Sequence, residues 1–252
     1  MNKTILLAVF LAVGCAPAAR AESRGKDAGA FAWKGDVAAG KTVYLRNLNG
    51  SIETVPATGK KLRIRAVTTG GAKVEVVEHD GTLTACGFPD AKAHTCGKNG
   101  EYDVSGTTRK QSKVEMIVDV PRGVKVDASS VNGDVRVDRN GAAATLETVN
   151  GSIEARATGP VKATTVNGGI DVVVDRLSGT SGVTLETVNG TIRVQLPATA
   201  DADVRASVVN GSIDSKLALA GEKRSKRSLR GVLGTGGAPV ALETVNGSIE
   251  LR

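Results

Sequence analysis

The chain has 252 residues, a formal net charge of +7 and 40% hydrophobic residues, but only 2% of its residues are aromatic. Its core must therefore be built from Val, Ile, Leu and Ala, which excludes a globule of large interdigitating rings. Residues 103–252 contain no Phe, Trp, Tyr or His. This part of the chain excludes histidine chemistry and aromatic platforms for sugars or bases.

Residues 1–21 are expected to be a secretory signal peptide. Lys3 supplies the positive start, and Ile5–Val13 form an apolar segment that is too short to span a bilayer. Small residues at 19 and 21 fit a cleavage site, so the mature chain would begin at residue 22. The protein is therefore predicted to be exported to the periplasm or the cell surface.

A second processing signal overlaps this leader. Residues 12–15, Ala-Val-Gly-Cys, are similar to the box of bacterial lipoproteins, in which the cysteine carries the lipid. Such boxes usually have Leu three residues before the cysteine, whereas Leu11 is four residues before it. Soluble release is favoured, and a form that is lipid-anchored through Cys15 is the alternative.

Residues 22–120 are expected to form degenerate β coils. The segments Leu62–Val67, Lys73–Val77 and Lys113–Val120 alternate or are rich in β-branched residues, as half-buried strands are. They would belong to the same architecture as the rest of the chain.

Two cysteines in this region are expected to form a disulfide. Cys86 and Cys96 are ten residues apart in a chain with an export signal, and an oxidising compartment favours a bridge that staples an insertion. A metal pair is disfavoured because only His94 lies nearby.

Residues 121–252 repeat a short phrase, Val-Asn-Gly followed by a small or polar residue and then Ile or Val. From Asn132 to Asn210 the copies are 18, 17, 22 and 21 residues apart, which indicates a repeat architecture. Apolar residues recur six and four positions before each Asn and three after it, and this alternation predicts strands. The residues predicted to form the turns are Asn49, Gly50, Asn132, Gly133, Asn150, Gly151, Asn167, Gly168, Asn189, Gly190, Asn210, Gly211, Asn246 and Gly247.

Two all-β architectures fit this repeat. In an antiparallel β meander, each Asn-Gly is a two-residue hairpin turn. In a β-solenoid, each repeat of about 20 residues is one coil and like residues stack on each other. The solenoid is favoured because stacking explains why the flanking Leu, Thr, Val and Ile recur together with the turn. Gly190 and its equivalents are expected to need a positive φ.

The last two copies are 36 residues apart, and residues 221–237 are expected to be a basic insertion. A mobile, solvated loop is the simpler interpretation. The functional interpretation is contact with anionic lipid, lipopolysaccharide phosphate or an acidic wall polymer. Nucleic acid is not expected as a partner of an exported chain. The residues predicted for this contact are Lys223, Arg224, Lys226, Arg227 and Arg230.

Two phrases carry a resemblance to a known family. They are Leu-Glu-Thr-Val-Asn-Gly-Ser-Ile at 242–249 and Val-Pro-Arg-Gly-Val-Lys-Val-Asp at 120–127. Over Ala30 to Arg252 the chain resembles the bacterial putative-adhesin family, a domain-of-unknown-function group with β-strand repeats. The resemblance implies a β-helix-like fold, and it brings no catalytic residues.

Catalysis is not expected, and no catalytic, cofactor-binding or metal-binding residue is predicted. The alternative is a carbohydrate-active enzyme, a polysaccharide lyase or hydrolase on a β-helix, which needs clustered carboxylates. Glu147, Glu186 and Glu243 occupy equivalent positions in the repeat. Thr164 and Ser207 are expected to separate them in the stack. A small-ligand carrier is disfavoured by the narrow core.

The sequence therefore predicts a non-catalytic exported envelope protein that acts as a structural scaffold or an adhesin-like interaction surface. Its partner would be an envelope protein, an anionic envelope polymer or a lipid surface. The sequence stops at Arg252, shortly after the last Asn-Gly, without a capping segment. Self-association through the C-terminal coil is therefore also expected.

Overall fold

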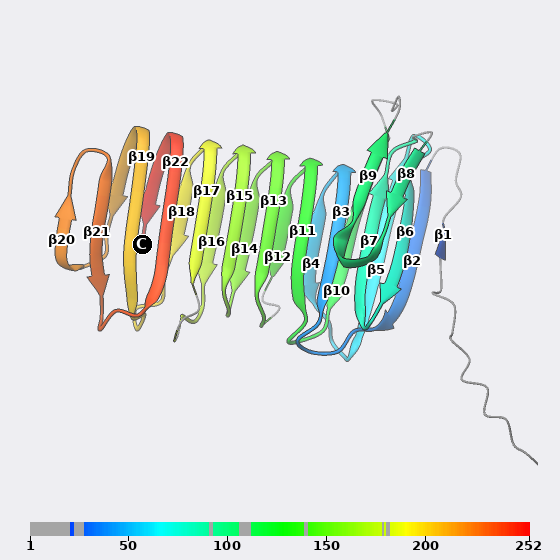
Figure 1. Cartoon of the computed structure of the whole chain (residues 1–252), viewed down its shortest axis with the longest axis horizontal. Helices are drawn as coiled ribbons and strands as arrows, with labels where there is room; N and C mark the ends of the chain where they lie inside the picture. The colour runs from blue at the N-terminus through cyan, green and yellow to red at the C-terminus, as the bar shows by residue number, and fades with distance from the viewer. Residues whose placement is uncertain are drawn as a thin grey trace, which may run out of the picture.

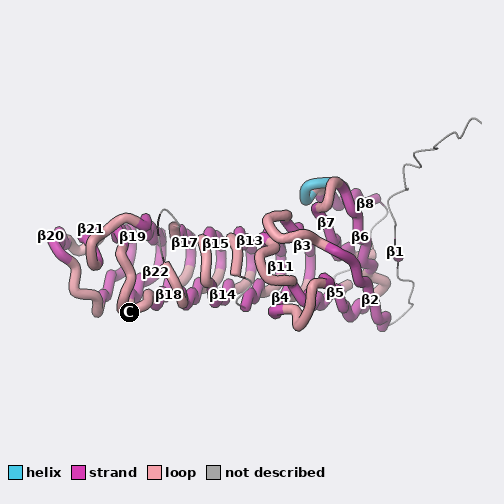
Figure 2. Tube along the Cα trace, turned by 90° about the horizontal axis from the view of Figure 1, so that it is seen from below, coloured by secondary structure: helices cyan, strands magenta, loops and turns pink. Residues whose placement is uncertain are grey.

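The protein is a two-sheet β-solenoid, seen in a computed structural model that describes residues 21–22, 28–90, 93–105, 112–138, 141–177, 179 and 182–252. The predicted signal peptide, apart from its last residue, and Cys15 lie outside the described residues. Each regular coil contributes one strand to each of two facing sheets (Figures 1 and 2). The described residues contain no helix that is long and apolar enough to cross a membrane.

The first sheet carries the strand that precedes each Asn-Gly. Within the regular coils its strands pair parallel and in register. Its spatial order is β1 (Ala21–Glu22), β6 (Lys73–His79), β7 (Thr82–Phe88), β3 (Thr42–Asn49), β11 (Lys125–Asn132), β13 (Ala144–Asn150), β15 (Val161–Asn167), β17 (Val183–Asn189), then the N-terminal halves of β22 (Ala238–Leu251) and β19 (Ala202–Ser215).

The second sheet carries the strand that follows each Asn-Gly. It too is parallel in the regular coils, and it ends in antiparallel strands at the N-terminal side. Its order is β2 (Ala28–Asp36), β5 (Lys61–Thr69), β10 (Lys113–Val120), β4 (Ile52–Pro56), β12 (Val135–Asp138), β14 (Ile153–Ala157), β16 (Ile170–Val174), β18 (Ile192–Gln195), then the C-terminal halves of β22 and β19.

The apolar positions of the repeat form the core between the sheets. In the coil of β17 and β18, Val183, Leu185 and Ile192 are all fully buried. Each lies in register with the same or a similar residue of the next coil, as Val183 does with Val240. Burying one such side chain contributes about 1.5–3 kcal/mol. The predicted solenoid is confirmed, and the parallel pairing of the repeat strands rules out the meander.

The three strands predicted within residues 22–120 are present. Leu62–Val67 lies in β5, Lys73–Val77 lies in β6, and β10 has the predicted bounds of Lys113–Val120. They form antiparallel pairs at one end of the stack, β5 with β10 and with β2, and β6 with β7. One hydrophobic cluster runs from Phe31 to Leu251, so these strands share the core of the regular coils.

The C-terminal strand is not at the end of the stack, contrary to the prediction from the sequence. One edge of β22 pairs with β17 and β18, and its other edge pairs with β19 along the whole strand. Figure 1 shows β22 in red between these neighbours. The expected open C-terminal coil is therefore an interior coil, and β19 follows it in space although it precedes it in sequence.

The basic insertion also differs from the expected loop. It forms a hairpin of β20 (Ala220–Arg224) and β21 (Ser228–Leu233), and β21 pairs antiparallel with β19. Leu229 is fully buried. Leu219 packs so closely on Gly231 that a Cβ at Gly231 would lie 2.7 Å from the Leu219 Cβ. This hairpin extends the first sheet and supplies the cap that a solenoid end requires.

Candidate interaction surfaces

The turn asparagines form a continuous ladder along the surface. From Asn132 onwards, the Nδ2 of each Asn donates to the Oδ1 of the equivalent Asn in a neighbouring coil, at 2.9–3.0 Å, and Asn49 accepts the first of these bonds. Such amide ladders add to the stability of stacked parallel strands. In spatial order the ladder contains Asn49, Asn132, Asn150, Asn167, Asn189, Asn246 and Asn210.

All seven turn glycines are closely packed, but only some of them have the expected positive φ. Among them, only Gly50, Gly211 and Gly247 have a positive φ, whereas Gly190 does not. A Cβ at Gly190 would lie 1.9 Å from the carbonyl oxygen of Gly168 in the next coil. A side chain at this position would therefore push two coils apart.

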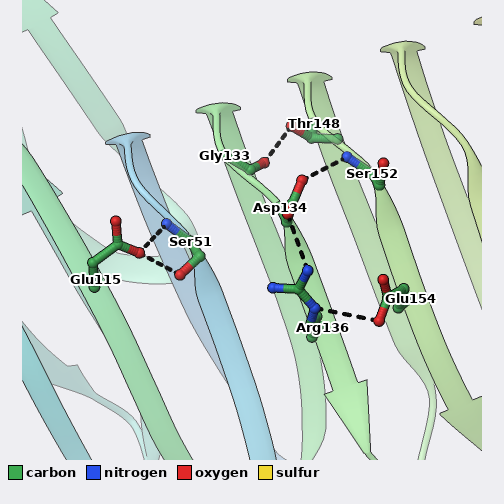
Figure 3. A network of polar contacts seen from close by, with 8 residues as sticks. All are labelled: Ser51, Glu115, Gly133, Asp134, Arg136, Thr148, Ser152 and Glu154. Carbon is green, nitrogen blue, oxygen red and sulfur yellow. Dashed lines mark hydrogen bonds and ion pairs between the residues drawn. The ribbon is translucent and has the colours of Figure 1, made fainter.

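A buried threonine column satisfies the carbonyls of these glycines. Thr148 Oγ1 donates to the Gly133 carbonyl oxygen at 2.9 Å (Figure 3), and Thr165 donates to Gly151 in the same way at 3.0 Å. Buried carbonyl groups need such partners. From the sequence these threonines were recognised only as recurring residues, although their inward position in the alternation indicated a buried role.

The outer face of the second sheet carries charges of both signs. Arg136 binds Glu154 at 3.2 Å and Asp134 at 3.1 Å, and Asp134 accepts a hydrogen bond from the Ser152 N–H at 2.9 Å (Figure 3). Burial alone would lower the pKa of Arg136, but the two carboxylates outweigh it and raise that pKa. In the same view Glu115 accepts hydrogen bonds from Ser51.

A groove of about 370 Å³ lies over these charges. Glu154 and Asp171 are neighbours in register at this groove. A pair of carboxylates is what a glycoside hydrolase uses. Here Glu154 is engaged in an ion pair with Arg136.

A second groove, of about 260 Å³, lies on the outer face of the first sheet. Glu186 and Glu243 stand next to each other in this groove, directly in register. The expected separation of these two residues by Ser207 is wrong, because β22 lies between β17 and β19. Glu147 and Glu186 are separated by Thr164, as expected from the sequence.

The basic hairpin continues this face of the first sheet. Arg230 lies in register with Lys223 on one side and with Arg205 of β19 on the other. Arg224 instead pairs with Glu222 at 3.2 Å. Arg205 was not predicted as part of this cluster, because only the antiparallel register of β21 with β19 brings it beside the cationic run.

The expected Cys86–Cys96 disulfide is present, with a Cα–Cα distance of 6.0 Å. It links β7 to β8 (Ala93–Cys96), which pairs with β9 (Tyr102–Ser105) beside the short 3-10 helix η1 (Lys98–Gly100). Figure 2 shows this insertion standing out from the side of the stack.

Aromatic and polar contacts hold the insertion against the first sheet. The rings of Phe88 and Tyr102 stack with centroids 5.1 Å apart, and the Tyr102 hydroxyl donates to the Gly87 carbonyl oxygen at 2.7 Å. Burial raises the pKa of Tyr102. His94 Nε2 lies 2.9 Å from Oε1 of the buried Glu75, a residue that sequence reasoning did not single out. No three metal-ligating side chains cluster among the residues that the structure describes.

Comparison with solved structures identifies the same fold. A crystal structure of a putative cell adhesion protein from Clostridium sporogenes is 11% identical, with a TM-score of 0.52, and the match covers 88% of this chain and 98% of that one. Putative adhesins from Bacteroides fragilis (14% identity, 88% and 97% covered, TM-score 0.32) and Parabacteroides distasonis (10%, 88% and 97%, 0.28) are more distant in shape. At these identities the likeness concerns the fold alone.

Comparison with protein families finds a match for the C-terminal part of the chain. No curated protein matches the chain. Residues 142–252 match the family model described as Toastrack DUF4097, and they span the regular coils from β13 to β22 together with the basic hairpin. The resemblance expected from the repeats is therefore confirmed: residues 142–252 are similar to the Toastrack DUF4097 family, and the solved structures of the same fold are described as putative adhesins.

Proposed function

We propose that the protein is a non-catalytic, exported component of the bacterial cell envelope that serves as a rigid scaffold with an adhesin-like surface. The observation that carries this proposal is the stack of coils, along which the outward asparagines form one ladder from Asn49 to Asn210. Such a stack presents long, repetitive faces, and extended surfaces of solenoids are used for binding.

Two further features support the proposal. The Cys86–Cys96 bridge fits an oxidising compartment outside the cytoplasm. The charges over the larger groove are engaged with each other, Arg136 with both Asp134 and Glu154, as in a solvated surface network. Both fit a surface protein better than the alternative of a carbohydrate-active enzyme.

The contact with the envelope is assigned to the tip of the basic hairpin. Lys226 and Arg227 lie between β20 and β21 and are exposed, and Lys223 and Arg224 on β20 are exposed as well. The tip is held in shape because Ser225 Oγ accepts hydrogen bonds from the Arg227 and Ser228 N–H groups. Its target is an anionic lipid or polymer surface, to which cationic clusters are attracted.

Cosedimentation of residues 22–252 with vesicles and with purified cell-wall fragments tests this function. We expect binding to anionic vesicles or wall polymer, little binding to neutral vesicles, and weakening with salt. The variant Lys226→Glu with Arg227→Glu should bind at least tenfold more weakly. The control, Lys60→Glu with Arg63→Glu, makes the same charge change at the other end of the molecule and should lose less than threefold.

Two results would overturn the proposal. One is equal binding to neutral and anionic surfaces by the wild-type protein and both variants. The other is release of soluble sugar fragments from envelope polysaccharide, because a scaffold without catalytic groups cannot cleave it.

A further inference from the structure

One short sequence occurs at three places in the stack. Val-Asn-Gly-Ser-Ile is centred on Gly151, on Gly211 and on Gly247. Asparagine is chemically labile when glycine follows it, because the glycine nitrogen can attack the side-chain Cγ and expel the amide as ammonia. Glycine has no Cβ to obstruct this ring closure. Since the three local sequences are identical, any difference in their reactivity must come from the fold.

In an interior coil, the following coil holds both polar groups of the turn glycine. The Gly151 N–H donates to the Asn167 carbonyl oxygen at 3.1 Å, and the Gly151 carbonyl oxygen accepts a bond from Thr165 Oγ1 at 3.0 Å. The same pair of bonds holds Gly190. A glycine nitrogen that donates in this way must break its bond to the next coil before it can attack Cγ.

Gly211 has no following coil, because β19 is the last repeat strand of the stack (Figure 1). The Lys216 N–H points back to β22 and donates to the Leu251 carbonyl oxygen at 2.9 Å. Successive N–H groups along a strand point to opposite sides. Gly211 lies an odd number of residues before Lys216, so its N–H points away from β22.

The basic hairpin does not cover this N–H either. β21 pairs with β19 from Ala202 to Ser207, and one further bond runs from the Val208 N–H to the Arg227 carbonyl oxygen at 2.9 Å. Within the described part of the chain, no strand pairs with this edge of β19 after Val208. Gly211 is accordingly exposed, whereas the other glycines of the ladder are buried or half-buried.

The Asn210 side chain is also held less firmly than its interior equivalents. It donates to Asn246 Oδ1 at 3.0 Å, and the ladder ends there. Asn150, by contrast, donates to Asn132 and accepts from Asn167. At the last coil, therefore, both the attacking nitrogen and the amide that it attacks have lost the contacts that restrain them elsewhere.

We propose that Asn210 is a site of spontaneous covalent modification, whereas the stack protects the identical sequences around Asn150 and Asn246. The Gly211 nitrogen gives its proton to solvent base and bonds to the Asn210 Cγ. The Cγ–Nδ2 bond breaks and ammonia leaves, which produces a cyclic succinimide. Water then adds to either ring carbonyl carbon and opens the ring to aspartate or to isoaspartate. Water is the only co-reactant, and nothing is oxidised or reduced.

The tip of the hairpin favours this reaction. The bond between Val208 and Arg227 places the cationic tip beside the strand, two residues before Asn210. Attack on Cγ develops negative charge on the Asn210 amide oxygen, and neighbouring cations stabilise such a charge.

Isoaspartate at this position would loosen the last half of the coil. It adds one carbon atom to the main chain at the corner of β19, which pairs in register with β22 on both sides of that corner. The residues from Ser212 to Ser215 would then lose their register. The modification does not rest on the envelope function proposed above.

Incubation of residues 22–252 in heavy-oxygen water at mildly alkaline pH, followed by peptide mapping with mass spectrometry, tests the proposal. Each carboxylate formed during the incubation carries the heavy oxygen, so digestion in ordinary water adds no labelled product. In the native protein, labelled product at Asn210 should form at least tenfold faster than at Asn150 or Asn246, whose glycines must first leave their hydrogen bonds. Isoaspartate should accompany aspartate, because direct hydrolysis of the amide gives aspartate alone.

The unfolded chain is the matched control for local sequence. In denaturant the three identical sequences should react at equal rates. Two results would overturn the proposal. One is a native Asn210 that reacts no faster than Asn150 and Asn246. The other is an Asn210 that is equally favoured in the unfolded chain, because the preference would then owe nothing to the fold.

Asn49 is the control for the other end of the ladder. Its side chain only accepts a bond, from Asn132, but the Gly50 N–H donates to the Asn132 carbonyl oxygen at 2.8 Å. Asn49 should therefore react as slowly as Asn150, and a fast Asn49 would overturn the role given to the Gly211 nitrogen. Asn210→Gln should abolish the fast product while circular dichroism shows an unchanged fold. Asn140 precedes Gly141 but lies outside the described residues, so its peptide is scored separately.

Discussion

Gly190 lies directly against Gly168 of the neighbouring coil, so that a Cβ on Gly190 would stand 1.9 Å from the Gly168 carbonyl oxygen. The same contact joins Gly151 to Gly133 at 2.2 Å and Gly247 to Gly190 at 1.9 Å. The spacing of the coils therefore depends on a column of residues without side chains, and the asparagine and threonine ladders lie on either side of it.

Replacing Gly190 by Ala should destabilise the protein by about 2–3 kcal/mol, because the added methyl group must displace the backbone of the next coil. The matched control is Gly59→Ala. A Cβ there has nothing within 4 Å, and its φ lies outside the positive range. We expect a change within about 0.5 kcal/mol for the control. Urea unfolding of both variants measures these changes. Equal losses in the free energy of unfolding would refute the close-packing explanation.

Asn167→Ala should cost about 1–2 kcal/mol, since it removes the bond that Asn167 donates to Asn150 and the bond that it accepts from Asn189. Asn210 ends the ladder and only donates, to Asn246. Asn210→Ala should therefore cost about half as much. If chemical unfolding finds the two variants alike, the ladder does not act as a continuous unit.

Removing the disulfide with Cys86→Ala and Cys96→Ala should lower the free energy of unfolding by about 2–3 kcal/mol, because the bridge closes a short loop. Reductant should destabilise the wild-type protein by a similar amount and leave the variant unchanged. A variant as stable as wild type would mean that the packing of Phe88 and Tyr102 alone holds the insertion.

Asp201 should make stability depend on acid pH. Its carboxylate accepts a hydrogen bond from the Thr235 N–H at 2.6 Å, and this bond lowers the pKa of Asp201. The stabilisation is therefore fully present above the ordinary pKa of Asp, about 4, and is lost as the pH falls through the lower folded value. Asp201→Asn should melt below wild type at pH 7. The difference in melting temperature between the two proteins should become smaller towards pH 2. A difference that does not depend on pH would contradict this explanation.

The sequence was sufficient for the solenoid because each strand is surrounded by copies of itself. Val183, Leu185 and Ile192 recur with the same spacing around each Asn, so alternation and stacking could be inferred together. The spatial order of the coils could not be inferred as easily. Because the repeat strands are so similar, any of them can pair in parallel with any other. The sequence therefore does not tell whether β22 or β19 pairs with β17.

One coil departs from the threonine column. Thr244 donates to the Gly190 carbonyl oxygen, and most copies have Thr or Ser at this position. The copy in β19 has Val208, which cannot donate. Because β19 lies next to β22, Val208 stands where a threonine would donate to the Gly247 carbonyl oxygen, and the threonine column ends at Thr244.

The charged residues of these surfaces could be identified from the sequence, but which of them lie next to each other could not. The run from Lys223 to Arg230 was visible in the sequence, yet Arg205 joins it only through the register of β21 with β19. Glu186 and Glu243 are far apart in sequence, and they meet because β22 is inserted between two earlier strands. Contacts that depend on a change in chain order leave no local pattern.

Intact-mass spectrometry of the protein taken from the cells that produce it, with thiols alkylated before lysis, tests the central claim of an exported envelope scaffold most directly. The account predicts a chain that begins at Glu22, carries no alkyl group and gains two after reduction. A chain that retains the leader and has Cys86 and Cys96 alkylated without reduction would show that it never left the reducing cytoplasm, and it would contradict the account.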